Sequence, residues 1–496
     1  MAVLTQGVLL LNQIVLLPIQ IRVWGTEGAA YWYSVMAVAA VTTAADFGLR
    51  TAGHAEIVSH ARDRQAGTEF QHLWAWIRIL VFTITFFLVV VDFLWNEFHS
   101  GTPYPLWRPA LLIAIALEMI LTVRVGYLDS LGLYREAEGG YLQMAAAKLV
   151  LSVGALVIFQ APPVTLAWIW FLTGFFAIAQ QSRLCSRLKL LRIFEPIPPG
   201  LSIRTLATVR YTMADPCSGW VRINGPVVVL TLIAQPVVIV TYVAMRAVFG
   251  AARTTILQLS RYASVEYLAL RQARKFEQAE VHVTLSVLVA AFFASGVAGF
   301  VIADNGRLAS LLLHKMDFQY YQEIAITFGL GGAYYSYQIL QAVSRRSGEV
   351  ERVAHRQYAY MACSVVFAGI ALVAKSTLLW LLLMLTSDIM ISLLVMLTGP
   401  GGGILSHTAA GRRGTAAATA SFVILLAMWL VVHFENFDFL RAWTVSAFTC
   451  TAGFYVPWIV LIGLVNVCLA YGLPIRKADL ATPLTEADPA ASAELK

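Results

Sequence analysis

The chain has 496 residues, of which 59% are hydrophobic and only 13% charged, and its mean hydropathy is +0.72. Soluble domains have roughly 25% charged residues, so this composition excludes an ordinary soluble protein. The formal net charge is +7. A membrane-spanning helix needs about 20 apolar residues, so about fourteen spans account for nearly the whole chain. The sequence therefore predicts an all-α polytopic membrane protein.

The predicted helices follow one another with short connections. The apolar run from Val8 continues through Pro18 without a basic leader or a small-residue cleavage site, which predicts a retained first helix rather than a signal peptide. The predicted helices cover about residues 4–23, 29–49, 74–95, 109–129, 141–160, 164–184, 207–232, 236–262, 281–303, 320–343, 357–375, 377–398, 415–434 and 443–473. The helix 236–262 includes Arg246, Arg253 and Arg261, which a lipid-facing helix would not tolerate.

Basic residues concentrate in alternate loops, by about three to one, which places these loops and both termini in the cytoplasm. This orientation predicts a multi-pass protein of the cytoplasmic (inner) membrane. The longest predicted inside loops include 183–206, which is basic and ends in a proline-rich stretch.

The chain is expected to divide into two pseudo-symmetric six-helix bundles and a C-terminal helix pair. Pro18 is expected to end helix 1 and Pro236 to end helix 7, an echo that suggests a repeat. The predicted boundaries are 1–184 for the N-terminal bundle, 185–206 for a basic cytoplasmic linker, 207–398 for the second bundle, 399–476 for the helix pair and 477–496 for a disordered cytoplasmic tail.

Ionisable side chains fall inside the predicted helices, where each costs several kcal/mol unless it faces protein or water. Those expected near mid-depth are Glu118, Lys148, Arg222, Arg246 and Asp388. Those expected nearer the cytoplasmic side are Arg78, Arg124, Asp46, Asp215 and Arg253. So many charges predict a hydrated, net-positive cavity.

The basic members, Arg222, Arg246, Arg253, Arg78, Arg124 and Lys148, are the candidates for substrate binding. Because a guanidinium keeps its charge and matches phosphate or carboxylate with two hydrogen bonds, a cavity lined by arginine predicts an anionic passenger. The acids Asp46, Glu118, Asp215 and Asp388 are expected to serve coupling or structure. Simple structural pairing is the competing interpretation, with Arg222 on Asp215 and Lys148 neutralising an acid.

Nothing in the sequence predicts an enzyme, a metal site or a cofactor. The five cysteines form no CxxC pair, and the run Gly399–Gly403 lacks the GK[ST] ending of a phosphate-binding loop. The aromatic run Tyr31, Trp32 and Tyr33 is expected at a membrane interface. Coupling to a proton or a sodium gradient is left open.

The opening of the chain resembles that of bacterial polysaccharide (O-antigen repeat-unit) flippases. The resemblance rests on Leu17-Pro18, on the loop Arg22–Gly28, on Tyr31-Trp32 and on the D-x-G-L sequence Asp46–Leu49. Ala30-Tyr31 stands where the family commonly has Tyr-Gly, and Trp24 where it has Leu. These flippases belong to the multidrug/oligosaccharidyl-lipid/polysaccharide exporter superfamily.

The resemblance implies a V-shaped pair of bundles that flips an undecaprenyl-pyrophosphate-linked oligosaccharide repeat unit for O-antigen, capsule or exopolysaccharide export. It implies a cationic lumen, for which Arg22, Arg50, Arg78, Arg222, Arg246 and Arg253 are candidates. The implied partners are the polyprenyl-pyrophosphate-linked glycan, membrane lipids, and a polysaccharide polymerase with its co-polymerase, and no nucleic acid. The alternatives of the same fold are a multidrug/cation antiporter and a peptidoglycan-precursor flippase.

Overall fold

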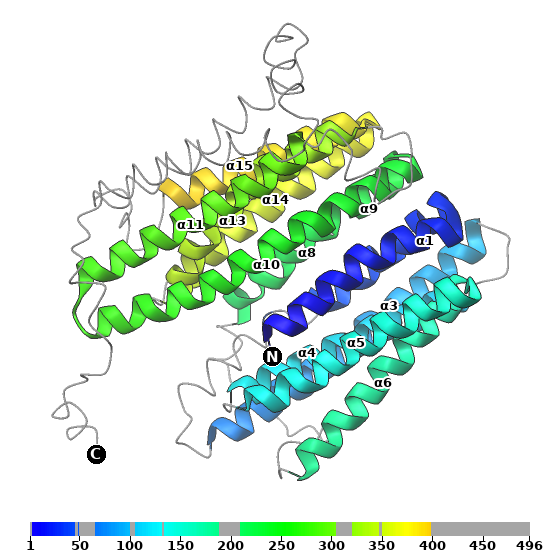
Figure 1. Ribbon diagram of the computed structural model, residues 1–496, viewed down its shortest axis with the longest axis horizontal. Coiled ribbons are helices and arrows are strands. Elements are labelled where there is room, and N and C mark those ends of the chain that lie inside the picture. Colours follow the sequence, from blue (N-terminus) through cyan, green and yellow to red (C-terminus); the bar gives the residue numbers. More distant parts are fainter. Residues whose placement is uncertain are drawn as a thin grey trace, which may run out of the picture. The chain divides into compact units, whose positions relative to one another are not determined.

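The computed structural model is built from helices and describes residues 2–44, 48, 65–99, 105–130, 133–187, 209–303, 320–346 and 350–397 (Figure 1). The helices of these residues are α1 (Ala2–Ala39), the short 3-10 helix η1 (Ala40–Ala44), α3 (Gln65–His99), α4 (Trp107–Ser130), α5 (Tyr134–Phe159), α6 (Pro163–Arg187), α8 (Ala214–Ile223), α9 (Gly225–Ile233), α10 (Pro236–Gln272), α11 (Phe276–Ala303), α13 (Tyr321–Arg346), α14 (Val350–Ala374) and α15 (Thr377–Leu397).

Every helix predicted before residue 398 falls on one of these described helices. By length and hydropathy, 7 of the described helical stretches can cross a membrane, and the first of them, Gly7–Ala44, spans both of the first two predicted helices. The predicted helix pair 399–476 and the tail 477–496 lie outside the described residues.

The first two helices meet at Gly25, inside α1. This glycine has φ 74° and ψ 176°, a conformation that other residues rarely adopt, and the helix is kinked at this point. Pro18 lies inside α1 and does not end helix 1, contrary to the prediction. A proline is tolerated in a membrane helix because neighbouring helices and side chains satisfy the freed carbonyl.

The predicted helix 207–232 is broken rather than continuous. Asn224 separates α8 from α9, and Pro226 lies in the first turn of α9, where its missing N–H costs least. The chain turns at Ala234, which has extended dihedral angles, and Pro236 opens α10 instead of ending the helix before it. α10 then continues to Gln272, beyond its predicted end.

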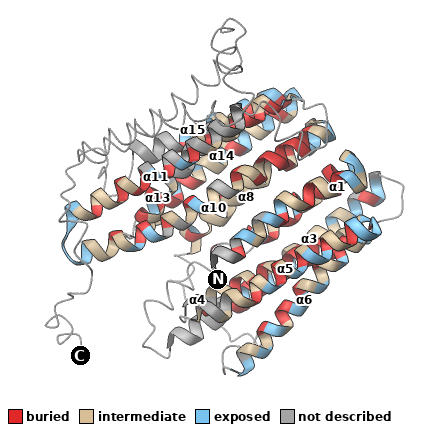
Figure 2. Cartoon of the chain, in the orientation of Figure 1, coloured by how far each residue is buried: buried red, intermediate tan, exposed pale blue. Residues whose placement is uncertain are grey.

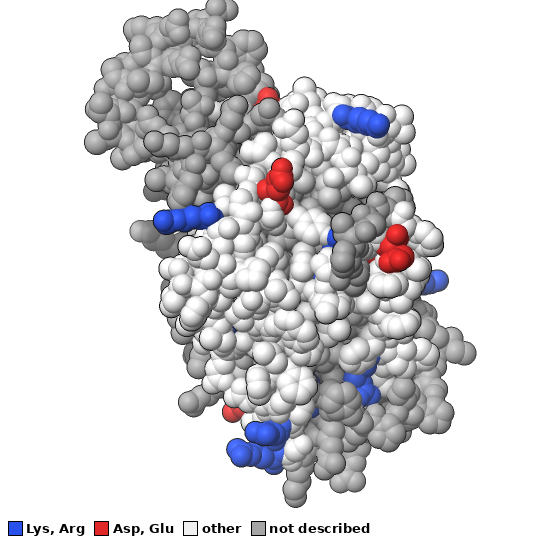
Figure 3. Space-filling view, turned by 90° about the vertical axis from the view of Figure 1, so that its right-hand side faces the viewer, with Lys and Arg blue, Asp and Glu red and all other residues white. Residues whose placement is uncertain are grey.

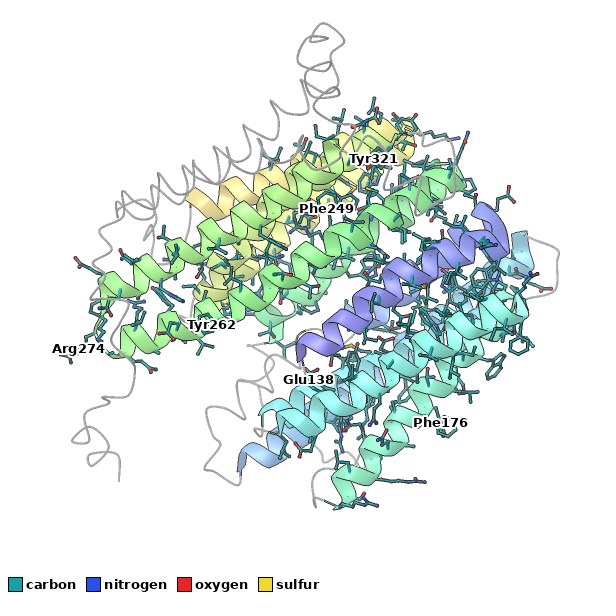
Figure 4. The ribbon with its side chains drawn as sticks, viewed as in Figure 1. Glu138, Phe176, Phe249, Tyr262, Arg274 and Tyr321 are labelled. Carbon is teal, nitrogen blue, oxygen red and sulfur yellow. The ribbon has the colours of Figure 1, made fainter. Side chains whose placement is uncertain are left out.

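The N-terminal helices form a bundle around α4, which contacts α1, α3, α5 and α6. Its core includes Trp74, Ile77, Met119, Leu121 and Met144. Buried positions recur along the helices of this bundle, and exposed positions mark the outer face of α6 (Figure 2). Phe176 of α6 is 66% exposed and points away from the bundle (Figure 4), as a lipid-facing side chain would. Charged side chains are sparse on the face that Figure 3 shows.

Helices of the second half pack on one another through aromatic rings. Phe249 of α10 stacks on Phe328 of α13, with ring centroids 5.4 Å apart, and Tyr242 contacts the same ring at 4.9 Å. Figure 4 shows Phe249 on α10 and Tyr321 at the start of α13.

The chain divides into two compact units. The first comprises Met1–Thr254, Phe300–Gly331 and Glu349–Ile391, and the second comprises Thr255–Gly299, Gly332–Gly348 and the chain from Ser392. In the second unit, α10 ends in a tight turn at Arg274, which has φ 59°. The N–H of Lys275 closes the turn on the Leu270 carbonyl at 2.9 Å. The predicted division into 1–184 and 207–398 stays a prediction.

Gly48, the glycine of the D-x-G-L sequence, touches the segment that precedes α8. Its φ is 74°, and an added Cβ would collide with the backbone of Thr212 and Met213. Only glycine fits this position, because both the left-handed conformation and the close approach exclude a side chain. Gly48 belongs to the first predicted half of the chain, and Thr212 and Met213 belong to the second.

Candidate functional site

Lys148 and Glu118, two of the predicted mid-depth charges, form an ion pair. Lys148 Nζ lies 2.7 Å from Glu118 Oε2, and the Tyr141 hydroxyl donates to Glu118 Oε1 at 3.2 Å. The ammonium also lies 3.9 Å from the ring centroid of Trp170, within cation–π range. Lys148 therefore neutralises an acid, as the structural interpretation proposed.

Arg78 and Arg124 lie on the same indole. Their guanidinium carbons are 5.9 Å and 5.6 Å from the ring centroid of Trp74, and both side chains are buried. Arg124 is only 1% exposed. The structure thus brings two predicted cationic residues together in the core of the N-terminal bundle.

Arg246 caps the break between α8 and α9. Its Nη1 donates to the Ile223 carbonyl at 2.9 Å and to the Asn224 side-chain oxygen at 3.2 Å. A helix end leaves carbonyls without intrahelical partners, and a cation there also complements the helix dipole. Arg246 therefore has a structural task that its position in the sequence did not reveal.

Arg222 pairs with Asp388, whereas the structural interpretation suggested Asp215 as its partner. Arg222 Nη2 lies 3.1 Å from Asp388 Oδ1, and both side chains are largely buried. Tyr360 lies beside the pair, with its ring centroid 6.0 Å from the Arg222 guanidinium and its hydroxyl bonded to Asp388. A Cβ added at Gly331 would lie 2.8 Å from Asp388 Oδ2, so the carboxylate rests against α13.

The remaining predicted residues are spread. Asp215 accepts a hydrogen bond of 2.9 Å from Gln357 of α14. Arg253 is partly buried on α10, and Arg22 is exposed on α1. Asp46 and Arg50 lie outside the described residues.

Two features of the structure were not predicted from the sequence. Arg356 precedes the predicted helix 357–375, but α14 begins earlier, at Val350, and this arginine is 5% exposed. Trp32 and Tyr33 were expected at a membrane interface and are instead buried in protein, where Trp32 stacks on Trp107 with centroids 5.5 Å apart. The helical period from Arg352 to Tyr360 is the signal that would have extended α14.

An apolar pocket of about 150 Å³ adjoins the Arg222–Asp388 pair. It lies among α8, α9, α14 and α15, and its walls include Trp220, Pro226, Tyr360, Ala368 and Leu383. Within the described part of the chain, no group of three or more His, Cys, Asp or Glu side chains could hold a metal ion. The site thus places an apolar pocket and aromatic rings beside the buried Arg222–Asp388 pair.

Solved structures of membrane transporters resemble this arrangement. An inward-facing multidrug resistance MATE family transporter of the MOP superfamily is 13% identical and has a TM-score of 0.56, covering 85% of this chain and 98% of its own. A MATE protein in the straight conformation is 14% identical with a TM-score of 0.53, covering 84% and 97%. An outward-facing MATE transporter is 13% identical with a TM-score of 0.51, covering 84% and 96%.

The chain has the fold of a MATE transporter. The expected all-α polytopic membrane fold is thereby confirmed, while identities this low describe the fold alone. No protein-family model and no curated protein matches the sequence.

Proposed function

We propose that the protein flips an undecaprenyl-pyrophosphate-linked oligosaccharide repeat unit across the bacterial cytoplasmic membrane, for O-antigen, capsule or exopolysaccharide export. The supporting observation is the sign of the buried charge. The charged side chains buried most deeply among the described residues are all basic: Arg78, Arg124, Arg356, and Lys148, whose charge is neutralised by Glu118. An excess of buried basic side chains favours an anionic passenger such as a pyrophosphate.

Two further observations favour this passenger. The opening residues resemble those of polysaccharide flippases, and the MATE fold belongs to the same superfamily. The glycine of the D-x-G-L sequence, Gly48, has a physical reason to be glycine in its contact with Thr212 and Met213.

A multidrug/cation antiporter is the second candidate, because the solved structures of this fold include multidrug resistance transporters. A cation site requires an acid that is available to the cation. Glu118 and Asp388 are instead each paired with a base, Lys148 and Arg222. The charge pattern therefore favours the anionic passenger. A peptidoglycan-precursor flippase would take a passenger of the same pyrophosphate chemistry.

The proposed mechanism is alternating access. The pyrophosphate docks on cavity arginines, the sugars occupy the hydrated lumen, and the polyprenyl tail stays in lipid. Both termini are proposed to be cytoplasmic, and a polymerase with its co-polymerase would receive the exported unit. Coupling of the transport to a proton or a sodium gradient stays open.

Deletion of the protein from its host tests the proposal. We expect a lipid-linked oligosaccharide to accumulate in the cytoplasmic leaflet, and mass spectrometry of extracted lipids would identify it. Wild-type protein should restore export. Arg222→Ala should not, whereas Arg183→Ala, at an exposed position of α6, should.

Arg222→Lys separates charge from folding, since it keeps the cation and should restore part of the export. Unchanged lipid-linked glycans together with new sensitivity to cationic drugs would refute the flippase and support the antiporter.

A further inference from the structure

Two residues that line the apolar pocket beside Arg222 carry buried donor groups that lack a partner among the described residues. Ser364 is 7% exposed and Trp380 is 4% exposed, and both line the pocket. Within the described residues, neither Ser364 Oγ nor Trp380 Nε1 has a hydrogen-bond partner. A buried donor without a partner is costly, so the pocket suits a ligand that brings an acceptor oxygen into largely apolar surroundings.

The size of the pocket limits the ligand. A cavity of about 150 Å³ admits a molecule the size of benzene. A hydrated sugar ring needs more hydrogen-bond partners than these walls supply. A single branched five-carbon isoprene unit fits both the volume and the apolar lining.

The charge lies at the edge of the same pocket. Tyr360 lines it and also contacts both Arg222 and Asp388. Ser364 follows Tyr360 by one turn of α14, so the two side chains share a helix face. A ligand with an isoprene unit in the pocket would therefore place an attached phosphate near Ser364, Tyr360 and Arg222.

We propose that this pocket binds the first isoprene unit of the lipid carrier, and that the adjoining phosphate takes the place of the Asp388 carboxylate on Arg222. The inference rests on the proposed function. It adds that the second predicted half, 207–398, recognises the lipid end of the passenger. Before binding, Asp388 holds the guanidinium. After binding, the phosphate pairs with the guanidinium. Asp388 keeps its hydrogen bond with the Tyr360 hydroxyl and moves away from α8.

The exchange makes a prediction that a purely structural ion pair does not. Asp388→Asn removes the competitor for Arg222, so affinity for an isoprenyl pyrophosphate should rise. If Asp388 served only to hold the fold, the same change should lower the affinity or unfold the protein.

The test uses the full chain in phosphatidylcholine nanodiscs, with farnesyl pyrophosphate as the probe and inorganic pyrophosphate and farnesol as comparison compounds. Calorimetry would measure the dissociation constants. Ala368→Phe fills the pocket, and Val366→Phe, on the neighbouring exposed position of the same helix, is its matched control. Ser364→Ala removes one donor with little change in volume, and Trp380→Phe removes the other donor while keeping an aromatic, though smaller, ring.

We expect Ala368→Phe to weaken farnesyl pyrophosphate about tenfold or more, and Val366→Phe to leave it unchanged. Inorganic pyrophosphate should bind more weakly and should not respond to Ala368→Phe. Ser364→Ala should weaken the farnesyl compound, and Asp388→Asn should strengthen it.

Several results would overturn the inference. One is undiminished binding of farnesyl pyrophosphate in Ala368→Phe, Ser364→Ala and Trp380→Phe. If this binding still depended on Arg222, the inference about the pocket would fail and the proposed function would still be supported. Another is equal binding of farnesol, and a third is displacement of the probe by added phosphatidylglycerol, which would make the occupant an ordinary phospholipid. If no pyrophosphate compound binds at all, the proposed function fails together with the inference.

Discussion

At the scale of single residues, the partners of the buried charged side chains determine what these side chains can do. Lys148 shows this most clearly, since it contacts Glu118 at 2.7 Å and the face of Trp170. A buried pair of this kind contributes little net stability, but the loss of one partner leaves an isolated charge.

The Lys148–Glu118 pair gives a residue-scale prediction. Glu118→Gln or Lys148→Met alone should destabilise the protein by about 3–5 kcal/mol, because each leaves one charge unpaired away from water. The double variant should recover most of the loss. Unfolding in detergent, followed by circular dichroism, measures all three; single variants as stable as the wild type would show that the pair is not needed.

Sequence reasoning located these charges without finding their partners. Helical spacing relates residues within a helix, so it suggested Asp215 for Arg222, seven positions away. The observed partner, Asp388, lies on α15, far away in the sequence, and only the folded arrangement of the helices brings it near Arg222. Of the candidate site, the types and depths of the residues were predictable, and the pairs were not.

At the scale of elements, the break between α8 and α9 depends on a distant side chain. Arg246 lies on α10 and donates to Ile223 and Asn224 at the break. The sequence showed Asn224-Gly225-Pro226 within an apolar run, but hydropathy alone predicted one continuous helix there.

Removal of this cap is an element-scale prediction. Arg246→Ala should lower stability by about 1.5–3 kcal/mol, the usual effect of losing hydrogen bonds from a charged donor. Hydrogen–deuterium exchange should increase in a peptide that covers residues 220–230. Arg183→Ala on the exposed end of α6 is the control, and equal exchange in both variants would argue against the cap.

At the scale of the whole molecule, the predicted halves meet along α1, η1, α8 and α9. The Ser34 and Thr231 hydroxyl oxygens are 2.7 Å apart, and Trp220 Nε1 donates to the Ala37 carbonyl at 3.2 Å. Hydropathy predicted where the helices lie because it depends on local composition. It contains no information on which helices touch, so this contact was not predicted.

A cross-link at this contact tests alternating access. In a background without the native cysteines, Ser34→Cys with Thr231→Cys should form a disulfide, since the hydroxyl oxygens are already in contact. Oxidation should stop transport of the accumulated lipid-linked glycan in proteoliposomes, and reduction should restore it.

The matched control pairs Leu117→Cys with Gly174→Cys inside the N-terminal bundle, where a Cβ at Gly174 would lie 3.4 Å from Leu117 Cβ. This disulfide should leave transport intact. Full transport with the Ser34–Thr231 disulfide formed, as judged by mass spectrometry of the linked peptides, would contradict motion at this contact.

Gly331 has a consequence for how the protein tolerates change. A Cβ at this position would lie only 2.8 Å from Asp388 Oδ2. A single added methyl group on α13 would therefore push the Asp388 carboxylate away from α13. The substitution Gly331→Ala would thus change the geometry of the Arg222–Asp388 pair without adding or removing any charge. The spacing of two helix backbones, rather than the chemistry of either ion, thereby limits where this ion pair can form.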